Sequence, residues 1–203
     1  MRLYTPATNY GLRPDLAVIA KSIETESRVL DIGCGDGALM DVLVENRRCD
    51  ARGMEIDGAC VERCVAQGLS VVQGDANRDL ADYPDKGFDY TVLSQTLQTA
   101  TRPDEMLDQL LRVGRQAFVS FPNFAHWRTR AALMFGGKMP VTRAIPVSWY
   151  ETPNIHHVTV KDFRELAQEK GAKIEREWFF SSGLPVTAGT NWRAEFAVFQ
   201  LSR

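Results

Sequence analysis

The most restrictive feature of this sequence is the glycine-rich stretch DIGCGDG at residues 31–37, which follows an apolar run at 28–32 and precedes a helical pattern at 38–46. Glycine permits tight turns and lets a ligand approach the backbone where a Cβ atom would block it. The free N–H groups at the start of the following helix point at whatever binds there. In open parallel sheets this first strand–turn–helix unit is a usual ligand site. We therefore predict a binding site at this turn.

Apolar runs typical of strands alternate with helical patterns along the remaining chain, which indicates a parallel sheet covered on both faces. The predicted strands cover 28–32, 51–56, 70–73, 88–94, 116–121, 173–180 and 192–201. The last two are expected to pair antiparallel. The prediction is an α/β, Rossmann-like fold: a mostly parallel seven-stranded sheet, an antiparallel C-terminal strand and helices on both faces.

Local signals place several helix ends. Pro14 suits the first position of a helix that continues to residue 23. The patterns TRPD at 101–104 and TVKD at 159–162 predict capping boxes that open two further helices. Another helix is expected from about residue 124 to the glycine pair at 136–137.

The composition is that of one globular domain, which we assign to residues 1–203. The first ten residues have no apolar leader, and no run is apolar for long enough to cross a membrane. Four cysteines without a Cys-x-x-Cys pair fit a reducing compartment, so we expect a cytoplasmic protein. The net charge of −2 argues against binding to nucleic acid or to a membrane surface.

Charge is nevertheless uneven, because residues 109–150 contain no acid. The six cations of this stretch are Arg112, Arg115, Arg128, Arg130, Lys138 and Arg143. A solvated basic face is the simpler interpretation, and a docking surface for an anionic substrate or an acidic partner is the alternative. The Pro-rich loop at about 137–158 has the length of a lid or docking loop.

Two acids distinguish between the ligands that such a turn can hold. The glycines also fit the dinucleotide fingerprint, with Glu55 at the distance where an acid contacts a ribose. However, Asp31 and Asp36 would repel a pyrophosphate in a partly desolvated crevice. A cofactor with a cationic amino-acid end and no phosphate would be attracted instead. This favours S-adenosylmethionine (SAM), or its product S-adenosylhomocysteine.

Acids at two further strand ends complete the predicted cofactor site. Glu55 is expected to hold the ribose hydroxyls and Asp75 the adenine amino group. Each acid also has a simpler interpretation: Asp31 could bind amides of the turn, Glu55 could be a solvated strand end, and Asp75 could cap the segment 76–80. The full predicted set is Asp31, Gly33, Cys34, Gly35, Glu55, Ile56, Asp75, Ala76, Ser94 and Gln95.

The stretch VLDIGCGDG at 29–37 resembles motif I of the class I SAM-dependent methyltransferases, with GMEID at 53–57 and Gly74-Asp75 similar to their next acidic motifs. A narrower resemblance, to the methionine-biosynthesis family MetW, covers most of the chain up to Phe180. It is carried by GLRPDL at 11–16, GMEID at 53–57, SQTLQ at 94–98, RVGR at 112–115, FPNFAHWR at 121–128, Met139-Pro140 and WYETPNIH at 149–156. This resemblance implies a role in methionine synthesis together with a homoserine O-acyltransferase, whereas methyl transfer is implied by the fold alone.

The sequence does not identify the catalytic residues. His126, His156 and Tyr150 are weak candidates for a base or a pocket wall, and packing within a loop explains them as simply. No Asn-Pro-Pro-Tyr follows the fourth strand, which disfavours methyltransferases acting on nucleobases or protein amides, and we expect no metal site. Two hypotheses follow: an enzyme that methylates a small molecule, or a non-catalytic, SAM-sensing partner of the acyltransferase. A nicotinamide dehydrogenase is a distant third.

Overall fold

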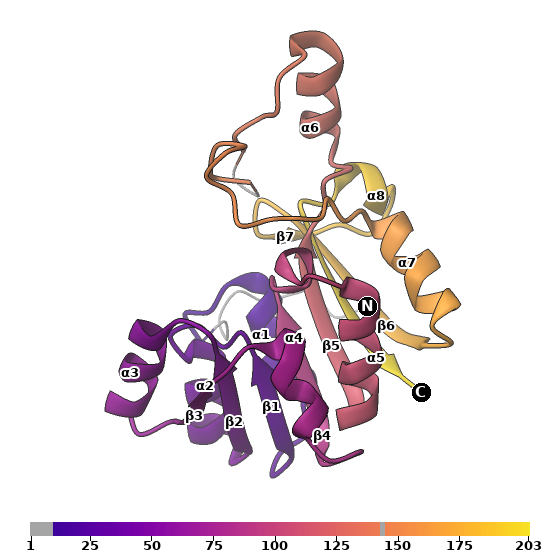
Figure 1. Cartoon of the computed structure of the whole chain (residues 1–203). Coiled ribbons are helices and arrows are strands. Elements are labelled where there is room, and N and C mark those ends of the chain that lie inside the picture. Colours follow the sequence, from indigo (N-terminus) through magenta and orange to yellow (C-terminus); the bar gives the residue numbers. More distant parts are fainter. Residues whose placement is uncertain (1–9, 143–144) are drawn as a thin grey trace.

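The computed structural model describes residues 10–142 and 145–203 and contains one eight-stranded sheet in the order β3-β2-β1-β4-β5-β8-β6-β7 (Figure 1). The first five strands are parallel, whereas β8 runs antiparallel to both β5 and β6. The strands are β1 (Arg28–Ile32), β2 (Asp50–Glu55), β3 (Ser70–Gln73), β4 (Phe88–Ser94), β5 (Gly114–Pro122), β6 (Lys173–Ser181), β7 (Leu184–Pro185) and β8 (Phe196–Ser202). The predicted fold class is confirmed.

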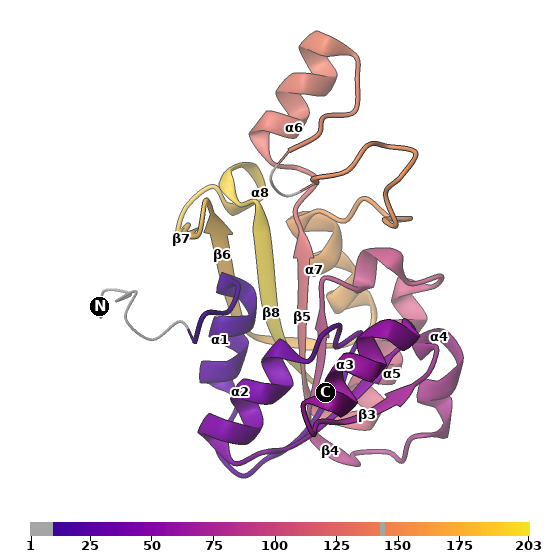
Figure 2. The same ribbon diagram turned by 90° about the vertical axis from the view of Figure 1, so that its left-hand side faces the viewer.

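Helices cover both faces of the sheet (Figure 2). One face carries α1 (Pro14–Ser22), α2 (Ala38–Arg47) and α3 (Gly58–Ala66). The other carries α4 (Ala76–Asp79), α5 (Pro103–Val113) and α7 (Val160–Glu169), with the short turns η2 (Leu80–Asp82) and η3 (Leu97–Thr99). The remaining elements are α6 (Trp127–Ala131), the π-helical segment η4 (Ala132–Gly136) and α8 (Thr190–Arg193).

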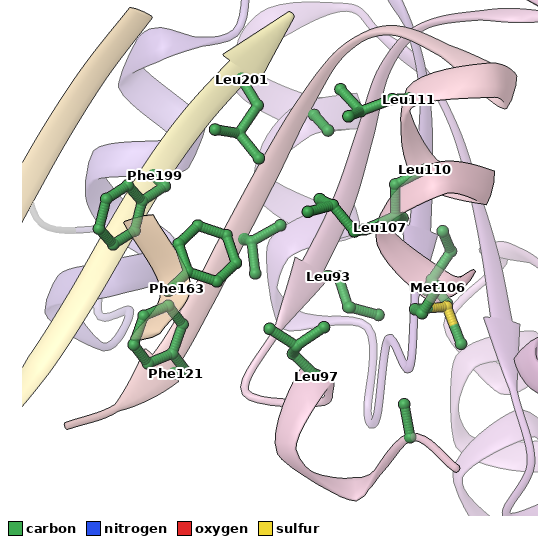
Figure 3. Packing of buried hydrophobic residues seen from close by; sticks show 14 of the residues in the cluster. Leu93, Leu97, Met106, Leu107, Leu110, Leu111, Phe121, Phe163, Phe199 and Leu201 are labelled. Atoms are coloured by element: carbon green, nitrogen blue, oxygen red, sulfur yellow. The ribbon is translucent and has the colours of Figure 1, made fainter. Parts of the chain in front are cut away.

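Alternation along the central strands divides the buried residues into two cores. In β5, Phe118 packs with α1 and α2, while Val119 and Phe121 pack with α5 and α7. The second core holds a cluster of three rings in which Phe163 lies 4.9 Å from Phe121 and 4.6 Å from Phe199, centroid to centroid (Figure 3). Because successive side chains of a strand point to opposite faces, a sheet buried on both faces needs such continuous apolar runs.

Two expectations about the C-terminal part need correction. The sheet has an eighth strand, because the two residues of β7 pair with the end of β6 through a turn at Ser182 and Gly183. The last strand begins at Phe196 rather than 192, since residues 190–193 form α8 after Gly189, whose φ is 63°. Short strands and single turns of helix carry too few residues to show a period.

The capping predictions had mixed outcomes. Thr159 caps α7, with its Oγ1 accepting the N–H of Asp162, as predicted. Thr101 does not cap α5; the cap position is Arg102, which forms no side-chain cap, and Pro103 occupies the first turn. Proline has no N–H group, so at this position the first turn has one donor fewer to satisfy. The helix can therefore start without a polar cap.

The helix expected from about residue 124 begins at Trp127, with His126 as its cap. The residues before it are buried and form a turn that the N–H of His126 closes on the carbonyl of Asn123. The N–H of Phe124 donates to the carbonyl of Val158, and that of Ala125 donates to Oδ1 of Asn123. Tertiary contacts therefore override the local helical pattern.

The acid-free basic stretch does not form one surface. Arg112 pairs with Asp85 and Arg115 with Asp89, near the start of β5. The cations at 128, 130 and 138 follow the opposite end of this nine-residue strand, roughly 30 Å away at the rise of an extended chain. Arg143 lies outside the described residues.

Candidate cofactor site

The glycine turn between β1 and α2 depends on positive backbone angles. Gly33 and Gly35 have φ values of 69° and 59°, which residues with a Cβ atom rarely adopt. A Cβ atom on Gly33 would lie 2.6 Å from Oγ1 of Thr96, so the turn packs directly on the segment after β4. At Gly35 no atom lies within 4 Å of the corresponding position. The backbone of the turn is therefore open to a ligand at Gly35.

Glu55, at the end of β2, fixes the turn from the neighbouring strand. Its Oε2 accepts the N–H of Gly35 at 2.8 Å, and its Oε1 accepts those of Ile56 and Asp57 at 2.8 and 3.0 Å. The side chain is buried, so the interpretation as a solvated strand end is wrong. Oε1 accepts two of these hydrogen bonds and Oε2 only one, so Oε2 has a further lone pair and can accept a hydrogen bond from a ligand hydroxyl.

Asp31 is buried beneath the turn. Glu55 holds the Gly35 amide of the turn, while no hydrogen bond from another described residue reaches the Asp31 side chain. Burial raises the pKa of the Asp31 carboxyl to about 7; the guanidinium of Arg13 lowers it, and the carboxylate of Glu55 raises it further. Burial also raises the pKa of the neighbouring Cys34 thiol, which therefore stays protonated.

Two cavities of about 460 Å³ each meet at Gly33 and Thr96. The first is polar and is lined by Arg13, Asp31, Cys34, Asp36, Ser94 and Gln95 among others. The second contains Glu55, Ile56, Asp75 and Ala76, with Met54, Ala100, Met106 and Pro153 as apolar walls. Nine of the ten predicted cofactor residues line one cavity or both, and the tenth, Gly35, is bound to Glu55.

Asp75 caps the short helix α4, with its Oδ1 accepting the N–H of Asn77 at 3.0 Å and its side-chain amide at 2.8 Å. These hydrogen bonds lower the pKa of Asp75. The simpler interpretation, a helix cap, is therefore present. It is compatible with a place in the cavity wall, where Asp75 also lies.

A buried polar network, which the sequence pattern did not predict, lies beside the first cavity. Oδ2 of Asp15, in the first turn of α1, accepts the hydroxyls of Ser94 and Ser120, both at 3.0 Å. Arg13 lies 3.4 Å from Asp15 and donates to Ser94 at 3.1 Å. The sequence signal for this network is the GLRPDL segment at 11–16, which carries part of the resemblance to MetW but does not by itself indicate a site.

The three catalytic candidates stand apart from both cavities. His126 caps α6 through its Nδ1, and burial lowers its pKa. Tyr150 is largely exposed and packs edge-to-face on Trp149. Nε2 of His156 is buried without a partner among the described residues. None of the three is among the described residues that line the two cavities.

Of the described residues in the loop predicted at about 137–158, one lines the second cavity. The last part of the loop is held by the carbonyl of Gln98, which accepts the N–H groups of Ile155 and His156 at 2.9 and 3.0 Å. This places Pro153 in the apolar wall of that cavity. The loop thus joins the cavity to the protruding α6 and η4 (Figure 1).

Comparison with known proteins identifies the family. The model of the family described as methionine biosynthesis protein MetW matches residues 13–201. The chain belongs to the MetW family. A relative from Rhodopirellula baltica, named bifunctional methionine biosynthesis protein MetXA/MetW, is 32% identical over 178 residues, which are 83% of this chain and 29% of the relative.

A second relative, named 2-ketoarginine methyltransferase, from Streptomyces arginensis, is 30% identical over 168 residues, or 72% of this MetW chain and 46% of the relative. The chain therefore spans less than half the length of either relative. The predicted resemblance to MetW is confirmed at the level of the family.

Solved structures confirm the fold. A SAM-dependent methyltransferase from Mesorhizobium loti has a TM-score of 0.69 at 18% identity, covering 92% of this chain and 96% of that one. The [4+2]-cyclase SpnF has a TM-score of 0.67 at 16% identity, covering 93% and 80%. Because the second protein is named for a different reaction, the fold alone does not determine the reaction.

In the described part of the chain, none of the helices has the length and apolar character needed to span a bilayer. Nor do the described residues bring three or more histidine, cysteine or acidic side chains together in a way that could hold a metal ion.

Proposed function

We propose that this MetW protein binds SAM in the two joined cavities and transfers its methyl group to a small molecule in the cytoplasm. The observation that carries the proposal is the pairing of a polar cavity around Asp31 with an apolar one around Ile56, joined beside the turn at the carboxyl ends of β1 and β2. This order matches a cofactor with a charged amino-acid end and an aromatic base.

The residues present fit the cofactor. Asp31 is buried and has no hydrogen-bond partner among the described residues, so its carboxylate is available to an ammonium group. Arg13, in the same cavity, is suited to the cofactor carboxylate. Glu55 is held in place by three amides, and its Oε2 would accept a hydrogen bond from a ribose hydroxyl. When bound, SAM supplies an electrophilic methyl group on a sulfonium.

A third cavity, of about 340 Å³, supports a small acceptor. It shares Arg13 and Gln95 with the polar cavity and is otherwise lined by Asp15, Phe180, Glu195 and Phe196 among others. A site next to the cofactor and partly shielded by rings suits a reaction that needs approach in line and exclusion of water. The relative from Streptomyces, named a methyltransferase of a small molecule, agrees with this class of acceptor.

The test uses the purified full-length protein with methyl-labelled SAM and an extract of cytoplasmic metabolites. We expect a labelled small molecule together with S-adenosylhomocysteine. A variant with Asp31→Ala and Glu55→Ala should give neither, provided circular dichroism shows that it is folded. Calorimetry with S-adenosylhomocysteine separates binding from transfer: saturable binding without any labelled product contradicts the enzyme and leaves a binding protein.

A second candidate is a non-catalytic, SAM-sensing partner of homoserine O-acyltransferase. It is supported by the Rhodopirellula relative, whose name joins MetXA and MetW on one chain. It also agrees with the position of His126, His156 and Tyr150 away from the cavities. Co-purification of the chain with separately expressed acyltransferase, with and without SAM, tests this role. Equal recovery under both conditions rejects the sensing part.

A further inference from the structure

The segment formed by α6, η4 and residues 137–142, here called the arm, exposes large apolar side chains in a row. Met134 and Phe135 are 79% and 85% exposed, and Leu133 beside them is also exposed. Figures 1 and 2 show the arm projecting beyond the ends of the sheet, away from the helices that cover it. Single exposed apolar residues are common in proteins, whereas a cluster of them on a projecting element indicates an interaction site.

The chain that returns from the arm adds aromatic residues to this region. Trp149 and Tyr150 are 74% and 71% exposed and pack on one another edge-to-face. Val141 and Ile155 are exposed as well. Tyrosine, tryptophan and methionine are the residue types enriched in the centres of protein interfaces.

The region is basic. Residues 127–158 contain four cations and one acid, a formal charge of +3; because the whole chain carries −2, the remainder carries −5. Arg128 lies over the ring of Trp127 at 5.3 Å and Arg130 over that of Trp192 at 5.2 Å. Within the part of the chain that the structure describes, no ion pair neutralises Arg128, Arg130 or Lys138. A partner should therefore present carboxylates around an apolar groove.

The arm is separate from the cofactor cavities. No described residue of 127–142 lines either of them, and Pro153 is the only described residue of 145–158 that does. A protein bound to the arm would therefore leave the glycine turn accessible to the cofactor. This excludes a function of the arm as a simple wall of the cofactor site.

We propose that the arm is the surface through which this chain binds homoserine O-acyltransferase, with Met134 and Phe135 entering an apolar groove and Arg128 and Lys138 facing carboxylates on its rim. The inference rests on the second candidate function above. Fusion of the two activities on the chain of the Rhodopirellula relative holds them at high effective concentration, as expected for parts that contact one another. A membrane is a weaker match, because the charge of −5 on the remaining chain opposes an anionic surface.

The experiment measures, by calorimetry, binding of the full-length chain to purified homoserine O-acyltransferase from the same organism. The variant Met134→Ser with Phe135→Ser should lower the affinity at least tenfold, and Arg128→Glu with Lys138→Glu should also lower it and remove its salt dependence. The matched controls are Val65→Ser and Arg63→Glu on α3, which are exposed and remote from the arm. All variants should bind S-adenosylhomocysteine as the wild type does.

Each of the other possible outcomes rejects a specific part of the proposal. If the wild-type chain does not bind the enzyme, the partnership itself is rejected, while methyl transfer is not affected. If binding survives the arm substitutions, only this surface is rejected. Sedimentation that shows a dimer dissociated by the same substitutions assigns the arm to a second copy, and binding to vesicles of anionic lipid assigns it to a membrane. Protection of 127–136 from hydrogen exchange by cofactor alone would instead show that the arm closes over its own chain.

Discussion

The N–H of Gly35 donates to Oε2 of Glu55 at 2.8 Å, so the end of β2 holds the centre of the glycine turn that follows β1. These residues are twenty positions apart in the sequence. The bond fixes the turn before any ligand arrives, because Glu55 also accepts the amides of Ile56 and Asp57. Preorganisation of this kind lowers the entropy lost on binding.

The substitution Glu55→Gln tests this arrangement. Its amide nitrogen cannot accept, so at least one buried N–H loses its partner, and we expect a loss of about 1–3 kcal/mol in the free energy of unfolding. Affinity for S-adenosylhomocysteine should fall more than tenfold. Urea unfolding and calorimetry measure the two effects. Glu62→Gln on the exposed face of α3 is the control, and equal results for both variants would contradict a structural role for Glu55.

The raised pKa of Asp31 predicts that the affinity for the cofactor depends on pH. This pKa is raised to about 7, so in the free protein the carboxyl is protonated below that pH. A bound ammonium group favours the carboxylate, and binding below pH 7 must therefore release a proton. The affinity for S-adenosylhomocysteine should fall by up to tenfold per unit as pH decreases from 7 to 5.5. Calorimetry in two buffers of different ionisation enthalpy detects the release of this proton on binding.

The control for this prediction is Asp31→Asn, whose weaker binding should not vary over the same range. Arg13 and Glu55 also act on this carboxyl, the first lowering its pKa and the second raising it. A pH dependence that persists in the asparagine variant would assign it to another residue.

Gly33→Ala tests the contact between the turn and Thr96. The variant combines a strained φ of 69° with a Cβ atom 2.6 Å from Oγ1 of Thr96, and we expect a loss of about 2–3 kcal/mol in stability. Gly68→Ala isolates the strain, because its φ is 80° and nothing lies within 4 Å. That change should cost about 1–2 kcal/mol. Adding Thr96→Ala to Gly33→Ala should restore part of the loss; strict additivity of the two changes would exclude the contact.

The three-ring cluster predicts where stability resides. Phe163→Ala removes a fully buried ring that contacts Phe121 and Phe199, and should cost about 3–5 kcal/mol. Phe135→Ala on the arm should change stability by less than about 0.5 kcal/mol, because that ring is exposed. Urea unfolding compares the two. A large loss from Phe135→Ala would mean that the ring packs on the chain and is not available to a partner.

The parallel part of the fold and nine residues of the cavity walls could be predicted from the sequence, because both depend on local order along the chain. Asp31, Glu55 and Asp75 lie at or just after the carboxyl ends of β1, β2 and β3, and parallel strands bring these ends to one edge. The contact of Asp15 with Ser120 joins residues 105 positions apart, and no periodicity indicates it. Phe135 is exposed because no other element packs on it, and the apolar pattern of 132–136 does not indicate this.

Pro153 lies in the wall of the apolar cavity and in the segment that returns from the arm. The backbone that leaves η4 passes this residue before the carbonyl of Gln98 holds it at Ile155 and His156. In the proposed function, an adenine ring in that cavity would contact Pro153, which belongs to the segment that returns from the arm. If the sensing proposal holds, binding of SAM and binding of the acyltransferase are coupled through residues 153–156, and by thermodynamic reciprocity each changes the affinity of the other by the same factor.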